Sequence, residues 1–304
     1  MSELNSHRRV VAWTNGSDEA AHATDWAARH AMARALPLHV LYVPRFDAPV
    51  GQGSSPGHSS PGHAAEGGDL ASDASDMERV DACLSRLRAQ YPDLAVTEQA
   101  VLYGRRCPGP GLVDPEDILV TWPSGYLELA EQTELHVHAA ARLPAPTVFV
   151  PLNEAAQPSG RRVLLLTGPR FFPAAASFAF AAATDLGVAM DVVRLPCAYD
   201  EFLDEPRPAA HGPYSLGPRL RSEIAGMQAR FLGVPGEFYS LGDRPWPALR
   251  TMTRAAQLAV LGAGAGSGVD MRAVYDLGTC PVAVVPERSR RAETESRRAF
   301  ASLG

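Results

Sequence analysis

Residues 257–286 read QLAVLGAGAGSGVDMRAVYDLGTCPVAVVP, and the organisation of the rest of the chain can be worked out from them. Two short apolar runs, Leu258–Leu261 and Pro281–Val285, are bounded by Gly or Pro and are typical of buried parallel strands. Between them lie a glycine-rich segment, Gly262–Gly268, and a segment of helical length, Val269–Leu277. A strand, a glycine loop, a helix and a second parallel strand form the unit with which α/β proteins hold phosphate groups.

The same unit occurs a second time, earlier in the chain. Residues 117–151 begin with DILVTW, continue with a run of helical length and end with APTVFVP. Their last five residues, Thr147–Pro151, match Val282–Pro286 in pattern. The starts of the two halves also correspond, because Arg8–Val11 and Arg161–Leu164 each lead an apolar run toward a turn with glycine. Similarity at so long a period predicts a duplicated domain.

Apolar periodicity and turn residues predict the elements of each half. Strands are expected at 10–13, 38–43, 96–103, 117–122 and 147–150, and again at 163–166, 188–195, 237–241, 258–261 and 281–285. Helices are expected at about 17–36, 70–90 and 126–142, and at 173–186, 216–232, 247–256 and 269–277. This alternation predicts an α/β protein with two tandem doubly wound, Rossmann-like domains, each with a five-stranded, mostly parallel sheet.

The predicted boundaries follow from composition. The first domain spans 1–152 and the second 161–287, and a charged tail covers 288–304. The segment 47–68 consists largely of Gly, Ser, Pro and His, so it has almost nothing to bury, and we expect a flexible loop there.

Bulk composition excludes several classes of partner. The 304 residues carry a net charge of −6, which gives no electrostatic footprint for nucleic acid or for an anionic membrane. No run of eighteen apolar residues occurs, and the N-terminus lacks an apolar core of signal-peptide length. The four cysteines are widely separated and form no CxxC motif. These features predict a cytoplasmic protein with reduced thiols.

Several motifs together resemble the universal stress protein family. They are VVAWTNGS at 10–17, an alanine-rich helix that carries Trp26, LHV at 38–40 and CPVAVVP at 280–286. The resemblance covers both halves, so the chain looks like a tandem member of this family. It implies a pseudo-dimer of the two halves, in which Thr147–Val150 and Val282–Val285 pair antiparallel. Such pairing would cover two apolar strands that are otherwise prone to aggregation.

Nucleotide-binding members of this family carry an Asp at the end of the first strand and G-x2-G-x9-G-[ST] after the fourth. In the first half, Asn15 stands at the Asp position and TWPSG (121–125) replaces the glycine loop. We therefore interpret Asn15, Gly16 and Ser17 as a degenerate site, with no nest of backbone amides for phosphate.

The second half departs from the family pattern in a different way. Thr167 stands at the Asp position, and the glycines of the loop are two residues apart, so G-x2-G is absent. Ser267 is placed to cap the next helix and to turn amides toward an anion, but Asp270 in the first turn would repel phosphate. The alternative is a tight loop that uses glycine for close backbone approach. The candidate weak nucleotide or anion site consists of Thr167, Gly168, Gly262, Gly264, Gly266, Ser267 and Gly268.

No catalytic or metal site is predicted. The chain contains no G-x-S-x-G, H-E-x-x-H or P-loop lysine motif. His136 and His138 are two apart on a predicted helix, so they point to different sides. Trp122, Trp246 and Tyr126 near the strand ends could line a cleft, but we interpret them as partly buried aromatics at the rim of the sheet, which are commoner than ligand platforms.

The resemblance and the missing motifs together predict a non-catalytic stress-response protein that acts by binding a partner protein, without a cofactor. The first alternative is an ATP-binding stress protein that uses the second-half glycine loop. The second is an enzyme of the adenine-nucleotide α-hydrolase-like group. The sequence leaves open which protein is the partner and whether the chain also forms a homodimer.

Overall fold

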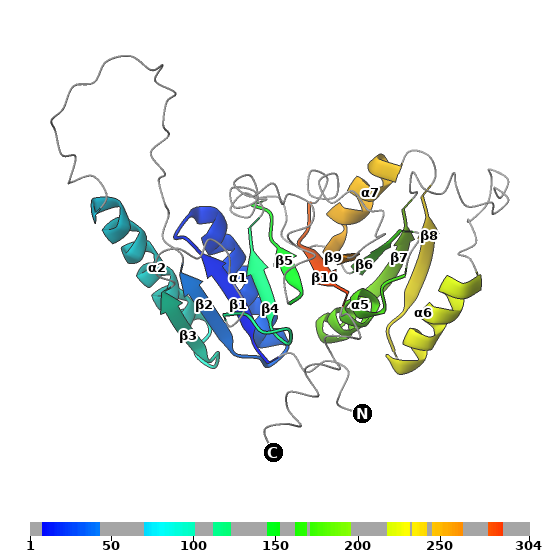
Figure 1. Ribbon diagram of the computed structural model, residues 1–304, viewed down its shortest axis with the longest axis horizontal. Helices are drawn as coiled ribbons and strands as arrows, with labels where there is room; N and C mark the ends of the chain where they lie inside the picture. Colours follow the sequence, from blue (N-terminus) through cyan, green and yellow to red (C-terminus); the bar gives the residue numbers. More distant parts are fainter. Residues whose placement is uncertain are drawn as a thin grey trace, which may run out of the picture.

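The computed structural model describes residues 8–42, 70–100, 112–122, 145–152, 162–168, 171–195, 218–231, 233–241, 245–263 and 279–287 (Figure 1). The predicted loop at 47–68, the helices expected at 126–142 and 269–277 and the charged tail at 288–304 lie outside these ranges.

Ten strands of the described chain form one continuous sheet, in the order β3-β2-β1-β4-β5-β10-β9-β6-β7-β8. The strands of the first half are β1 (Val10–Thr14), β2 (Leu38–Tyr42), β3 (Val96–Ala100), β4 (Ile118–Thr121) and β5 (Thr147–Phe149). Those of the second half are β6 (Arg162–Thr167), β7 (Ala189–Arg194), β8 (Gly236–Ser240), β9 (Ala256–Ala263) and β10 (Val282–Pro286). Within each half every pairing is parallel. The predicted fold class is confirmed.

The described helices lie against this sheet as the sequence pattern requires. They are α1 (Asp18–Ala33), α2 (Leu70–Gln90), α5 (Pro173–Leu186), α6 (Pro218–Arg230) and α7 (Pro245–Arg254). In α1 the Ser17 hydroxyl accepts a hydrogen bond from the amide of Ala20 at 3.2 Å, which caps the first turn. The alanines at 20, 23, 27 and 31 are all buried, so α1 lies close to the strands. The C-cap of α5 is Gly187, at φ 64°.

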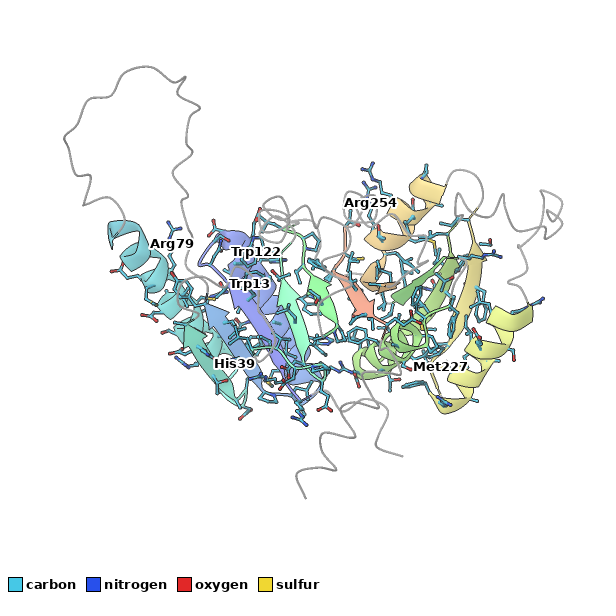
Figure 2. All side chains as sticks on the ribbon, in the orientation of Figure 1. Trp13, His39, Arg79, Trp122, Met227 and Arg254 are labelled. Atoms are coloured by element: carbon cyan, nitrogen blue, oxygen red, sulfur yellow. The ribbon has the colours of Figure 1, made fainter. Side chains whose placement is uncertain are left out.

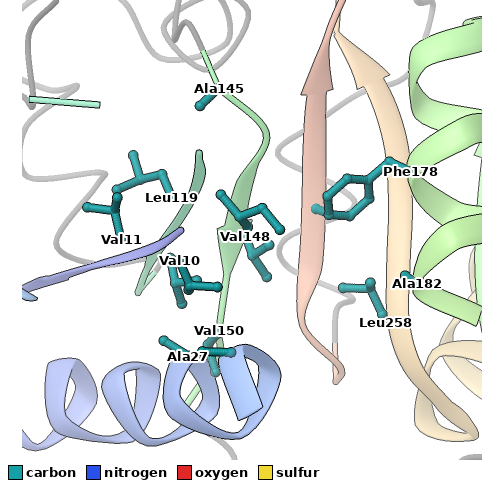
Figure 3. Packing of buried hydrophobic residues seen from close by; sticks show 14 of the residues in the cluster. Val10, Val11, Ala27, Leu119, Ala145, Val148, Val150, Phe178, Ala182 and Leu258 are labelled. Atoms are coloured by element: carbon teal, nitrogen blue, oxygen red, sulfur yellow. The ribbon is translucent and has the colours of Figure 1, made fainter. Parts of the chain in front are cut away.

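The two halves are joined edge to edge by their last strands. β5 and β10 pair antiparallel, with Val148 opposite Ala283 at the centre. Phe149 lies opposite Val282, and Thr147 lies opposite Val284. The predicted pairing is therefore confirmed, and Figure 1 shows one sheet that passes through both halves. Buried residues of both halves also belong to one core, part of which is drawn in Figure 3.

One region differs from the prediction. The helix expected to reach residue 256 ends at Arg254, and Ala256 already belongs to β9. At the other end, Gly262 and Ala263 belong to β9 and not to a loop, because they pair with Val285 and Pro286 of β10. From the sequence alone, Gly262 is predicted to begin a loop. The neighbouring strand supplies the hydrogen bonds that keep it extended.

Candidate functional site

The order of the strands defines one candidate site in each half. In the first half the connections from β1 and β4 run to opposite sides, because β2 lies on one flank of β1 and β5 lies beyond β4. Open α/β sheets bind their ligands outside the carboxyl ends of the strands at such a switch point. The equivalent place in the second half lies at the ends of β6 and β9. What each switch point can bind depends on which of its side chains are charged and which are neutral.

The turn after β1 satisfies its own polar groups. The Asn15 Oδ1 accepts a hydrogen bond from the amide of Ser17 at 3.0 Å, and the Thr14 hydroxyl accepts one from the amide of Gly16 at 3.3 Å. Gly16 has a φ of 79°, which side chains rarely adopt. The side chains of Asn15 and Ser17 therefore serve as turn and cap, and both are buried. These three predicted site residues lie together and hold the loop in shape.

Two indole rings lie at the switch point of the first half. Trp13 belongs to β1, and Trp122 follows β4 directly. Their ring centroids are 6.2 Å apart with an edge-to-face angle of 65°, and each residue is 4% exposed. Figure 2 shows them next to each other at the same end of the sheet. Trp122 is thus a buried residue in contact with Trp13, not a partly buried aromatic at the rim, which corrects the interpretation from sequence.

A phenylalanine ring lies at the switch point of the second half. Phe172 precedes α5 and is 6% exposed. A Cβ atom added to Gly262 would lie only 2.3 Å from Cγ of Phe172 and 2.4 Å from its Cβ. The ring therefore rests directly on the backbone of β9, at a residue where only glycine leaves room.

The aromatic groups of the two halves occupy equivalent places. Ile118 of β4 and Leu258 of β9 hold the same register position against β1 and β6. Four residues further on, Trp122 corresponds to Gly262. In the first half the strand supplies its own ring, and in the second half Phe172 supplies a ring from outside. Phe172 could not be predicted from the sequence, because no local pattern links it to Gly262, which lies 90 residues later.

Among the described residues, three buried polar atoms near these strand ends make no hydrogen bond. They are Nε1 of Trp13 and the hydroxyl oxygens of Thr121 and Thr167. Thr167, which was aligned with the family's Asp from the sequence, is 4% exposed. Thr167 and Gly262 come together because they follow the paired residues Leu166 and Leu261. Of the predicted second-half site, Gly264, Gly266, Ser267 and Gly268 lie outside the described residues, so the anion site remains a prediction.

The buried charges of the described sheet lie at its other end. Asp117 precedes β4 and is fully buried, and its carboxylate accepts a hydrogen bond from Nε of Arg9 at 3.1 Å. Arg162 begins β6 and donates to Asp191 at 2.5 Å. Burial is the main cause that raises the pKa of the Asp191 carboxyl, and Arg162 opposes that rise. Residues 14–17, 121–122, 167–168 and 262–263, which end the strands at the two switch points, are all neutral. The described part of each switch point therefore offers no acid or base.

Comparison with solved structures shows which proteins share this fold. A universal stress protein from Archaeoglobus fulgidus DSM 4304 superposes with a TM-score of 0.52 and 12% sequence identity, over 95% of this chain and 100% of that chain. A protein named as a universal stress protein, from Pseudomonas aeruginosa UCBPP-PA14, gives a TM-score of 0.48 at 12% identity, over 93% of this chain and 94% of that one. No family model matches the chain, and no curated protein matches it in sequence. The chain has the universal stress protein fold, as the motif resemblance implied.

Two further structural results bear on the chemistry. Among the described residues, no three His, Cys, Asp or Glu side chains are grouped so that they could hold a metal ion. No helix in the described ranges is long and apolar enough to cross a membrane.

Cys280 is expected to resist alkylation in the folded protein. It is 2% exposed, and burial raises the pKa of its thiol to about 12, so the reactive thiolate is scarce at pH 8. Iodoacetamide should modify Cys280 only after unfolding in urea, as followed by peptide mass spectrometry. The half-buried Cys83 is the internal comparison and should react faster. Rapid native modification of Cys280 would show that the start of β10 opens readily.

Proposed function

We propose that this chain is a non-catalytic regulatory protein of the universal stress type, which acts by binding another protein and does not hold a nucleotide as binding members of that family do. The observation that supports this most is the aromatic filling of both switch points. Trp13 and Trp122 contact each other in the first half, and Phe172 covers Gly262 in the second. The stress-response role itself rests on the shared fold and on the motif resemblance.

Simple energetics favour this proposal. A nucleotide in the second half would have to displace the buried ring of Phe172, and removing a buried Phe costs about 3–5 kcal/mol. An exposed helix N-terminus gives an anion only about 0.3–1 kcal/mol, whereas micromolar affinity requires about 8.2 kcal/mol. The neutral Thr167 and Asn15 supply no carboxylate to offset the difference.

In the proposed role the two halves work as an intramolecular counterpart of a dimer. Their continuous sheet supports this, because it holds both halves in one unit. A cytoplasmic location and a partner protein belong to the same proposal. The net charge of −6 speaks against nucleic acid or an anionic membrane as that partner.

ATP binding by the second half is the alternative that one observation favours. The Thr167 hydroxyl is buried and unpaired beside Gly262, at the switch point where such folds bind ligands. A ligand that moved Phe172 aside would give this hydroxyl a partner. The enzyme alternative has no such support, because the described strand ends at both switch points carry no acid or base.

Calorimetry with ATP and magnesium distinguishes the proposal from this alternative. We expect no binding tighter than about 1 mM, which corresponds to about 4.1 kcal/mol. A micromolar isotherm would contradict the proposal. If one were seen, its loss in Ser267→Asp, with the circular dichroism spectrum unchanged, would assign the site to the second-half glycine loop.

A further inference from the structure

The strand layer of the seam between the halves is nearly symmetric. Thr147 pairs with Leu119 of β4, and Val282 pairs with Ala259 of β9, so Thr147 and Val282 hold equivalent positions. In the antiparallel pairing each lies one residue from the central pair, Val148 and Ala283. Backbone hydrogen bonds of this kind carry no side-chain information. If only the strands mattered, the first half of one chain could pair equally well with the first half of a second copy.

The helix layer of the seam is not symmetric. Nε of Arg34, just after α1, lies 2.7 Å from Oδ2 of Asp185 in the last turn of α5. The Arg34 side chain is only 6% exposed, and its guanidinium lies 5.9 Å from the ring centroid of Phe178. α1 and α5 contribute to the same core, as do Val148, Val150 and Ala283 of the seam (Figure 3). This ion pair therefore joins the two halves beside the paired strands.

Each member of the pair has an equivalent position in the other half, and neither equivalent is charged. Arg34 is the C-cap of α1, and the C-cap of α5 is Gly187. Asp185 lies two residues before the C-cap, and the residue two before Arg34 is Met32. The first half thus presents an arginine and a methionine at the seam, and the second half presents a glycine and an aspartate.

We propose that Arg34 and Asp185 make this seam heterotypic, so that the first half accepts the second half and rejects a second copy of itself. Two first halves joined in this way would place each buried Arg34 opposite a Met32. Two second halves would place each Asp185 opposite a Gly187. The first arrangement leaves the buried Arg34 without a carboxylate, and an uncompensated buried charge is strongly destabilising. The second leaves Asp185 without a cation, at a smaller cost because its side chain is 31% exposed. The partner that this surface fits is the chain's own other half.

The surroundings of Arg34 show why its buried guanidinium depends on the Asp185 carboxylate. Burial is the main cause that lowers the pKa of the Arg34 guanidinium, and Asp185 opposes the lowering by charge and by a hydrogen bond. Nη1 of Arg34 is buried and makes no hydrogen bond. Asp185 is therefore the group that holds the cation at the seam.

Charge reversal in the full-length chain tests the proposal. Arg34→Asp alone and Asp185→Arg alone should each lower the melting temperature by roughly 6–15 °C, because each places like charges at a buried contact. The double reversal should recover more than half of that loss. The matched control is Arg86–Asp25, an ion pair at 2.8 Å within the first half whose side chains are 50% and 25% exposed. Reversal of either of its members should cost about 3 °C or less.

A second readout separates pairing specificity from simple stability. The Arg34→Asp chain carries two acids at the seam, and the Asp185→Arg chain carries two arginines. After refolding of a mixture, only a dimer with one chain of each kind, joined by exchange of halves, restores opposite charges at both seams. Native mass spectrometry should detect this mixed dimer in clear excess over the binomial share that random pairing of the two variants gives. A mixed dimer at only its binomial share, or a double reversal no more stable than the single ones, would overturn the proposal.

Discussion

Replacement of Ala283 with aspartate is expected to destabilise the protein more than any other single change considered for this chain. Ala283 is fully buried at the centre of β10, between Val148 of β5 and Val260 of β9. A carboxyl group placed there would lie among apolar side chains, without a cation or a hydrogen-bond donor to compensate it. We expect a loss of about 4 kcal/mol or more, which is a large part of the 5–15 kcal/mol that holds a typical domain folded.

Ala100 provides the matched control for this prediction. It is an exposed residue on β3, the strand at the first-half edge of the sheet. Ala100→Asp makes the same chemical change and should alter the free energy of unfolding by about 0.5 kcal/mol or less. Urea denaturation followed by circular dichroism measures both. Similar small losses for the two variants would mean that β10 is accessible to water and that the halves are not joined through it.

Removal of the Phe172 ring is expected to have the next largest effect. Because the ring is buried on Gly262, Phe172→Ala should cost about 3 kcal/mol or more. Gly262→Ala should cost about 1–3 kcal/mol, because its new Cβ would overlap the ring and force it to move. Once the ring is gone, the extra methyl group has room and fills part of the cavity. Gly262→Ala should then be close to neutral in the Phe172→Ala background.

Chemical denaturation of the two single variants and the double variant measures this coupling. The double variant should be more stable than the sum of the single effects predicts, by about 1 kcal/mol or more. Additive losses would show that Phe172 does not rest on Gly262. Gly226→Ala is the control for an added methyl group, because nothing lies within 4 Å of a Cβ placed there and its φ is not positive.

The fold could be predicted from the sequence because its signals are local and occur twice. The bounds of α2 and α5 agree with the predicted ones, and described strand ends differ by up to two residues. The pairing of β5 with β10 was implied by the family resemblance, and the two matching apolar strands that need cover agreed with it. Duplication supported each of these predictions, since a pattern read in one half could be checked in the other.

The candidate site was harder to predict because its decisive contacts are not local. Gly262 was expected in a loop, yet the hydrogen bonds of β10 make it the end of a strand. The ring that covers it comes from Phe172, and the sequence gives no spacing that connects the two. Trp122 was correctly placed near a strand end, but its burial depends on contact with Trp13, 109 positions earlier. The loss of the family's acidic residue at Asn15 and Thr167 follows from the motif resemblance and stays a prediction.

The most direct test of the proposed function is native mass spectrometry of the purified full-length chain, with and without ATP and magnesium at about 0.05 mM, well below the millimolar dissociation constant expected at the tightest. If aromatic rings fill both switch points, the protein should carry no nucleotide after purification and should show no one-to-one adduct beyond non-specific clustering. Phe172→Ala, measured alongside, shows whether the ring is what excludes the nucleotide. A wild-type chain that retains one ATP per molecule would contradict the account, because a switch point would then be open to nucleotide despite its ring.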